Sequence, residues 1–142
     1  MARLRETVTN TRDAARRWAD TWQRSWIANK PEPIIALYAD SATYATAPFR
    51  EPQMGKSGAR DYLLPVLAAQ KDVRAWFGEP IVDGERASVA WWGIATEEGQ
   101  PITYAGVSLL RFDADGLVID EWDAWNMLEG ERAPPPGWGA AG

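Results

Sequence analysis

The sequence predicts an α+β domain, with three helices in the first half of the chain and a curved antiparallel sheet in the second half. Two patterns carry this prediction. Up to about residue 70, apolar residues recur with helical spacing, and beyond it strand-like segments are separated by Asp-Gly or Glu-Gly pairs. Consecutive hairpin turns of this kind indicate an antiparallel meander, and such a sheet can curve around the helices and leave a cavity at its open end.

The first helix is expected at residues 13–28, where Trp18, Trp22 and Trp26 recur at every fourth position and form one apolar stripe. Arginine, aspartate and glutamine residues occupy the other side, as on a helix that packs against a core. Two shorter helices complete the set. They are expected at residues 34–38 and 56–69.

The strands follow from alternation between apolar and polar residues and from the turns that separate them. They are expected at residues 42–46, 74–82, 86–96, 102–112 and 117–127. Because side chains alternate between the two faces of a strand, Glu121, Asp123 and Trp125 share one face of the last strand. Two carboxyl groups two positions apart lie roughly 7 Å from each other, close enough to influence each other's protonation.

The chain divides into a domain at residues 1–130 and a tail at residues 131–142. The tail is rich in proline and glycine, which predicts an irregular and loosely held segment. Trp138 is its one large apolar residue and could dock back onto the domain.

Charge and composition exclude several classes of function. The net charge is −5 and no basic patch stands out, so nucleic acid is not an expected partner. No apolar run is long enough to cross a bilayer and no signal-peptide core is present, so we expect a cytoplasmic protein without a membrane partner. The chain has no cysteine and no histidine, so proton transfer must use carboxylates, tyrosine, lysine, arginine or water. We expect neither a metal nor another cofactor.

Two segments carry a resemblance to a known family. They are LYADSATYATAPFREPQMGKSGARDYL, residues 37–63, and the hairpin ITYAGVSLLRFDADGLVIDEWDAWNM, residues 102–127. Together they resemble the SnoaL-like branch of the nuclear transport factor 2 superfamily, which includes limonene-epoxide hydrolase, ketosteroid isomerase and SnoaL-type polyketide cyclases. The resemblance implies a cone-shaped fold with an internal pocket.

The resemblance also implies three catalytic residues. Asp123 falls where limonene-epoxide hydrolase and SnoaL-type cyclases carry an acid–base aspartate on the last strand. Tyr44 and Thr46 fall where the epoxide hydrolase holds its attacking water. The remaining partners of that hydrolase do not match, because its second aspartate and its arginine are replaced by Trp91 and Val89. The catalytic histidine of SnoaL has no counterpart in this chain.

Ligand-binding residues are expected around these three, on the inward faces of the same elements. They are Trp22, Trp76, Trp91, Tyr104, Ser108, Glu121 and Trp125. Aromatic walls of this kind suit a hydrophobic small molecule that is planar or polycyclic. Glu121 is expected at the mouth of the cone or in a dimer contact. Arg50 and Lys56 are expected to be solvated surface residues, with a place at the rim, where they could attract an acidic ligand, as the alternative.

Two classes of function remain open on these grounds. One is a cofactor-independent enzyme in which Asp123 performs isomerisation, cyclisation, dehydration or epoxide opening. The other is a non-catalytic domain of the same fold that binds a small molecule or mediates dimerisation. Trp92 and Trp122 face outward on their strands, which favours a homodimer through the outer face of the sheet.

Overall fold

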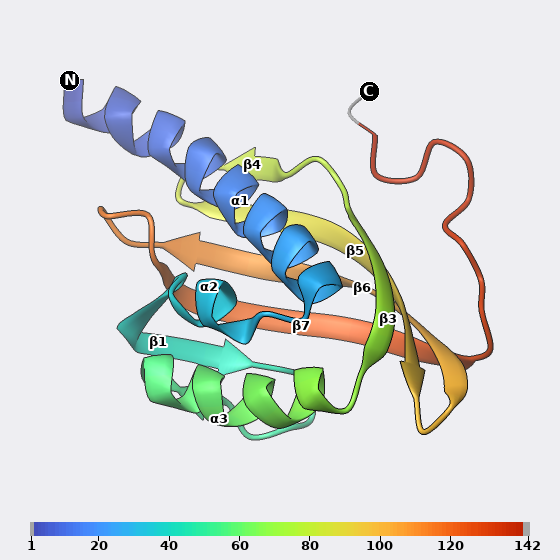
Figure 1. Ribbon diagram of the computed structural model, residues 1–142. Helices are drawn as coiled ribbons and strands as arrows, with labels where there is room; N and C mark the ends of the chain where they lie inside the picture. Colours follow the sequence, from blue (N-terminus) through green and yellow to red (C-terminus); the bar gives the residue numbers. More distant parts are fainter. Residues whose placement is uncertain (1, 141–142) are drawn as a thin grey trace.

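The computed structural model describes residues 2–140, and side chains for residues 11–140. Three helices pack against a seven-stranded sheet, which confirms the α+β prediction (Figure 1). The helices are α1 (Ala2–Ala28), α2 (Pro31–Ile35) and α3 (Gly55–Ala68). The strands are β1 (Tyr38–Ala45), β2 (Gln53–Met54), β3 (Lys71–Phe77), β4 (Ile81–Asp83), β5 (Arg86–Glu97), β6 (Gln100–Phe112) and β7 (Val118–Glu129).

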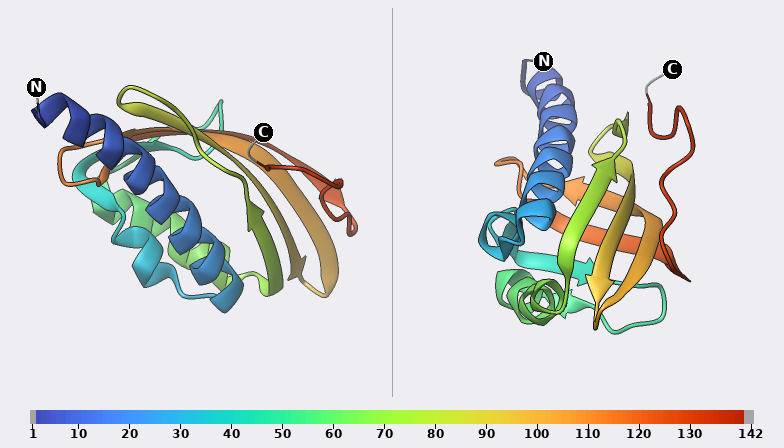
Figure 2. Two further views of the ribbon diagram at one scale, coloured as in Figure 1. Left: turned by 90° about the horizontal axis from the view of Figure 1, so that it is seen from above. Right: turned by 45° about the vertical axis from the view of Figure 1, so that its right-hand side comes forward.

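The sheet has the strand order β2-β1-β7-β6-β5-β3, with β4 added to β5. It is strongly curved, and the helices lie on its concave side (Figure 2). The meander from β5 to β7 is antiparallel, as the turns predict. In contrast, β1 runs parallel to β7. Hairpin turns report only on strands that are neighbours in sequence, so this long-range pairing leaves no signal of that kind.

Several predicted boundaries are wrong. The first helix begins at Ala2 rather than at residue 13, and the first strand begins at Tyr38 rather than at residue 42. The second helix begins at Pro31 and ends at Ile35. Its start fits the preference for proline in the first turn of a helix. Because the helix ends early, Tyr38 is the first residue of β1. The strand expected at residues 74–82 is two strands, β3 and β4, separated at residues 78–80. Pro80 lacks the backbone N–H that a continuous ladder would need.

The tryptophan stripe of α1 packs onto the sheet as predicted. Trp18 is 1% exposed and Trp26 is 7% exposed. Trp26 lies so close to β5 that a Cβ atom at Gly93 would be 2.2 Å from the indole, so only glycine fits there. The opposite side of α1 is polar. Across residues 2–140, no helix combines the length and the apolar character that crossing a membrane requires.

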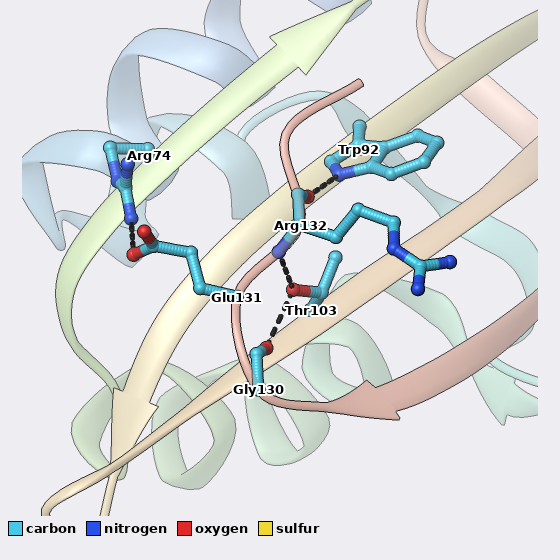
Figure 3. Close-up of polar contacts among 6 residues, drawn as sticks. All are labelled: Arg74, Trp92, Thr103, Gly130, Glu131 and Arg132. Atoms are coloured by element: carbon cyan, nitrogen blue, oxygen red, sulfur yellow. Dashed lines mark hydrogen bonds and ion pairs between the residues drawn. The ribbon is translucent and has the colours of Figure 1, made fainter. Parts of the chain in front are cut away.

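The C-terminal tail is not loose, at least through residue 140. It turns back over the convex face of the sheet, away from the helices (Figure 2). Thr103 donates a hydrogen bond to the Gly130 carbonyl and accepts one from the Arg132 N–H, and the Trp92 indole N–H donates to the Arg132 carbonyl at 2.7 Å (Figure 3). These partners fix the backbone of the tail, which proline content alone does not reveal.

Two side chains extend this anchorage. Arg74 of β3 forms an ion pair with Glu131 (Figure 3). Trp138 docks as expected, with its ring edge-on to Trp92 at a centroid distance of 5.9 Å. The last two residues of the predicted tail, 141 and 142, lie outside the described residues.

The tail divides the convex face into a covered and an open part. Ile94, which faces outward on β5, is only 2% exposed. Leu109 and Trp122 on β6 and β7 are 57% and 48% exposed. The apolar surface that could meet a second copy is therefore the open part, and the homodimer through this face stays a prediction.

Replacing Trp138 by alanine should lower the free energy of unfolding by about 1–2 kcal/mol, because the edge-on contact with Trp92 and its burial are lost. Urea unfolding followed by circular dichroism measures this. Phe49→Ala is the control, because this aromatic ring in the loop after β1 is fully exposed, and we expect a change below about 0.5 kcal/mol. Equal losses in the two variants would contradict the docking of the tail.

Candidate active site

A cavity of about 380 Å³ lies between the helices and the concave face of the sheet. This volume is in the range that accommodates small molecules. Nine of the ten predicted site residues line it, all except Trp76. Those nine are Trp22, Tyr44, Thr46, Trp91, Tyr104, Ser108, Glu121, Asp123 and Trp125. The sequence therefore predicts which faces of β1, β5, β6 and β7 meet in the interior.

Asp123 is held by a chain of hydrogen bonds across three adjacent strands. Ser108 is its direct partner in the β6–β7 register, and the serine hydroxyl donates to Asp123 Oδ1 at 2.6 Å. The Trp91 indole N–H in turn donates to Ser108 Oγ at 2.9 Å. Since an indole N–H can only donate, it directs the serine proton toward the carboxylate. Trp91 and Ser108 thus orient Asp123.

Glu121 is the most deeply buried group of the site, with no exposed surface. Its Oε1 atom accepts hydrogen bonds from the Trp18 indole N–H at 3.1 Å and from the Tyr38 hydroxyl at 2.8 Å. The position expected for Glu121, at the mouth or in a dimer contact, is wrong. Trp18 of α1 and Tyr38 at the start of β1 cover this end of β7. Because the sequence predicts that Tyr38 lies in a helix, it does not predict that Tyr38 contacts Glu121.

Burial and mutual repulsion raise the pKa values of the two carboxyl groups by different amounts. Burial raises the pKa of Asp123 to about 6, while the nearby polar groups of Glu121, Ser108 and Tyr44 oppose this increase. The pKa of Glu121 lies well above its usual range, because of burial first and then the charge of Asp123. Both groups therefore keep their protons to higher pH than exposed carboxyl groups do, and Glu121 more so than Asp123.

Tyr44 and Thr46 approach the same carboxylate from β1. Tyr44 is 1% exposed and stacks on Tyr38 at a centroid distance of 5.1 Å. Burial raises the pKa of Tyr44, so that it remains a neutral hydroxyl. Thr46 is equally buried, and its backbone carbonyl accepts a hydrogen bond from the Trp125 indole N–H at 2.7 Å.

Within the described residues, three buried polar side-chain atoms have no hydrogen-bond partner. They are Trp22 Nε1, Thr46 Oγ1 and Glu121 Oε2, and all three residues line the cavity. An unpaired buried polar group costs about 1–3 kcal/mol, so native proteins leave few of them. Their gathering around one cavity indicates a place where a ligand or water supplies the missing partners.

Trp76 is the predicted site residue that the structure places elsewhere. It pairs with Trp92 in the β3–β5 register and does not line the cavity, whereas Phe77, the next residue, does. Val73 and Ala75 are buried and alternate with Phe77, so the inward face of β3 carries the odd-numbered residues. The predicted strand at residues 74–82 did not establish that register.

Sequence reasoning also missed other lining residues. Trp26 and Gln70 lie in the wall and bond to each other, the indole N–H donating to Gln70 Oε1 at 2.7 Å. Trp26 belongs to the apolar stripe of α1 and contributes both to the core and to the cavity wall. Tyr62 and Glu97 also line the cavity, and neither carries a local signal. No group of three or more carboxylate, thiol or imidazole side chains in the described chain could hold a metal ion.

The comparison with known families agrees with this geometry. The family model described as "SnoaL-like domain" matches residues 15–121, about three quarters of the chain. No curated protein matches the sequence. The match ends at Glu121, so Asp123 lies just beyond its last residue.

Solved structures share the fold at low sequence identity. SalBIII, described as an epoxide hydrolase/cyclase-like enzyme with a role in pyran ring formation in the polyether salinomycin, has a TM-score of 0.71 and 15% identity over 82% of this chain and 95% of its own. RV0760c from Mycobacterium tuberculosis has a TM-score of 0.71 and 18% identity, over 82% and 96%. A ketosteroid isomerase-like protein from Catenulispora acidiphila, in complex with trimethylamine, has a TM-score of 0.64 and 16% identity, over 73% and 81%.

The raised pKa of Asp123 should make wild-type stability fall with rising pH. The folded state holds the proton up to about pH 6, and the unfolded state releases it near pH 3.9, so stability is lost across that window. Relative to Asp123→Asn, the wild type should lose about 1–3 kcal/mol between about pH 4 and about pH 7. Urea unfolding at several pH values measures the difference.

The control for this measurement is Asp20→Asn, which removes an exposed carboxylate on α1. We expect it to follow the wild-type pH dependence. A flat difference between wild type and Asp123→Asn over the same window would contradict a buried, proton-binding Asp123.

Proposed function

The chain belongs to the SnoaL-like domain family, and from this premise we propose that it is a cofactor-independent enzyme that performs acid–base chemistry on a hydrophobic small molecule. Asp123 is the proposed general base and acid. The observation that carries the proposal is a carboxylate with a pKa of about 6, fixed by Ser108 at the wall of an apolar cavity. A base with a pKa near the working pH is suited to proton transfer in both directions.

The proposed proton transfer starts from ionised Asp123. The carboxylate removes a proton from a carbon, a hydroxyl or a water in the cavity, and the protonated acid later returns that proton to another atom of the substrate. These two proton transfers leave no net change in protons for isomerisation, cyclisation and dehydration. For epoxide opening, the proton taken from water returns to the alkoxide that forms. No cofactor enters any of these steps.

Negative charge that develops on a substrate oxygen needs donors. Tyr44 is a neutral hydroxyl, and protonated Glu121 is a second acid beside Asp123. The Trp22 indole N–H has no partner and is a third candidate. A neutral acid in an apolar site can stabilise an oxyanion by donating a hydrogen bond, as general experience with enolising enzymes indicates. We assign these residues to substrate oxygen atoms.

The walls support a hydrophobic or polycyclic substrate. Nine aromatic side chains line the cavity, and they come from α1, α3 and five of the strands. Flat apolar walls favour planar ring systems, which gain contact area without losing conformational freedom. Trp91, Tyr104 and Trp125 are proposed to bind the substrate body. SalBIII, which shares the fold, is itself described as acting in ring formation.

A non-catalytic small-molecule carrier is the second candidate. Trp91 and Val89 occupy positions where the resemblance to epoxide hydrolase would require an aspartate and an arginine, and this observation favours binding without turnover. The Catenulispora acidiphila protein of the same fold is described in complex with trimethylamine, a small molecule. The cavity argues against a purely structural domain, because the tryptophans do not fill it.

Deuterium exchange separates the two candidates. In deuterated water, the wild-type protein should accelerate exchange of the α-protons of bicyclic and steroidal ketones, read by mass spectrometry. Asp123→Asn should lower the rate about 10²–10⁴-fold, because the base is removed, while ligand binding by tryptophan fluorescence is kept. Asp120→Asn, an acid on the other face of β7, should leave the rate unchanged. Binding of these ketones without any exchange would favour the carrier.

Ser108→Ala provides a test of positioning. Loss of the 2.6 Å hydrogen bond to the carboxylate should raise the pKa of Asp123, so the pH profile of the exchange rate should move upward by about one pH unit. A merely structural role for Ser108 would lower the rate at all pH values without moving the midpoint of the profile.

A further inference from the structure

We propose that the mouth of this cavity binds a carboxylate of the ligand through Arg50, so that the ligand class is an apolar ring system with one anionic group. The proposal rests on the proposed function for the cavity, and it adds the chemistry of the substrate's outer end. Arg50 is the one cationic residue among those that line the cavity in the described chain.

Arg50 is held over an aromatic platform. Its guanidinium carbon lies 5.7 Å from the centroid of the Trp125 ring. The backbone N–H of Arg50 donates to the Ala47 carbonyl at 3.3 Å, which closes a turn in the loop after β1. The Trp125 indole is fixed in turn by its hydrogen bond to the Thr46 carbonyl. The ring and the loop thus present the guanidinium at the cavity together.

The donors of Arg50 are not used by a carboxylate of the protein. None of the five ion pairs in the described part of the chain includes Arg50. The cation–π contact with Trp125 does not use the N–H donors of the guanidinium, and its planar fork of donors can bind a planar anion. Tyr62 of α3 lies beside it: burial raises the pKa of Tyr62, and the Arg50 cation opposes this increase.

The other charges of the cavity set the orientation of a ligand. Asp123 and Glu121 lie at the inner end, and the negative charge of this acid pair repels an anionic group there. Glu97 is the remaining carboxylate of the lining, and it accepts a hydrogen bond from the Tyr104 hydroxyl. A carboxylate on the ligand is therefore expected to point outward, toward Arg50.

The order of residues along β7 sets the two ends of the ligand. Trp125, the platform of Arg50, follows Asp123 by two positions on the same face of β7, so the two Cα atoms are roughly 7 Å apart. A fused two-ring body that lies along this face would have its carboxylate toward Arg50 and its far edge toward Asp123. Its rings would lie against the aromatic wall that includes Trp91 and Tyr104. The proposal thus places the anionic group and the reacting atom at opposite ends of the ligand.

Three probes with the same ring body test the proposal: 2-naphthoate, 2-naphthamide and 2-naphthylmethylammonium. Their affinities are measured by calorimetry at about pH 7.5 and low salt. We expect wild type to bind the acid about tenfold more tightly than the amide, and the ammonium probe most weakly. Arg50→Met should remove the preference for the acid, and Arg50→Lys should retain part of it. Arg24→Met, which removes a cation from the exposed side of α1, should leave the preference intact.

Several outcomes would overturn the proposal. They are equal affinity for acid and amide in wild type, an acid preference that survives Arg50→Met, and tightest binding of the ammonium probe. The last would mean that Asp123 and Glu97 set the preference. Failure of all three probes to bind would also overturn it, because the cavity would not accept a ring body. The acid–base proposal is judged separately by deuterium exchange on ketones without a charged group, so either proposal can fail alone.

Discussion

Two carboxyl groups on one face of β7 share an apolar cavity, and the rest of the site is organised around the repulsion between them. Such a pair is tolerated only if one member keeps its proton and both are hydrogen-bonded. Trp18 and Tyr38 supply the donors for Glu121, and Ser108 supplies one for Asp123. These donors come from α1, β1 and β6, so the burial of two acids ties together parts of the chain that are far apart in sequence.

The tryptophans of this site supply hydrogen-bond donors as well as apolar surface. An indole provides a large apolar surface and a single N–H that can donate but never accept. Trp18 and Trp91 use that N–H to direct hydrogen bonds toward the acid pair, while their rings exclude water. Without histidine or cysteine, the chain assembles its polar network from carboxyl, hydroxyl and indole groups. The same residues thus line the cavity with apolar surface and orient its acid pair.

Local patterns predicted most of the fold and most of the site. Turns between β5, β6 and β7 establish the meander, and alternation along β7 brings Glu121 and Asp123 to one face. What failed depended on contacts that are distant in sequence. The depth of Glu121 depends on a cover from Tyr38, and the orientation of Trp76 depends on the β3–β5 register. Composition predicts a loose tail because it carries no information on the tail's hydrogen-bond partners, which lie on the convex face of the sheet.

The tail has a practical consequence for handling this protein. Trp92, whose indole binds the tail, is the chain neighbour of Trp91, whose indole faces the cavity, so the two sides of β5 are joined by one peptide unit. A purification tag or a fusion partner attached at the C-terminus would be joined to a segment that packs on the convex side of β5, behind the cavity wall. The beginning of α1 projects away from the sheet (Figure 1). Attachment at the N-terminus is therefore the choice that leaves the wall as it is.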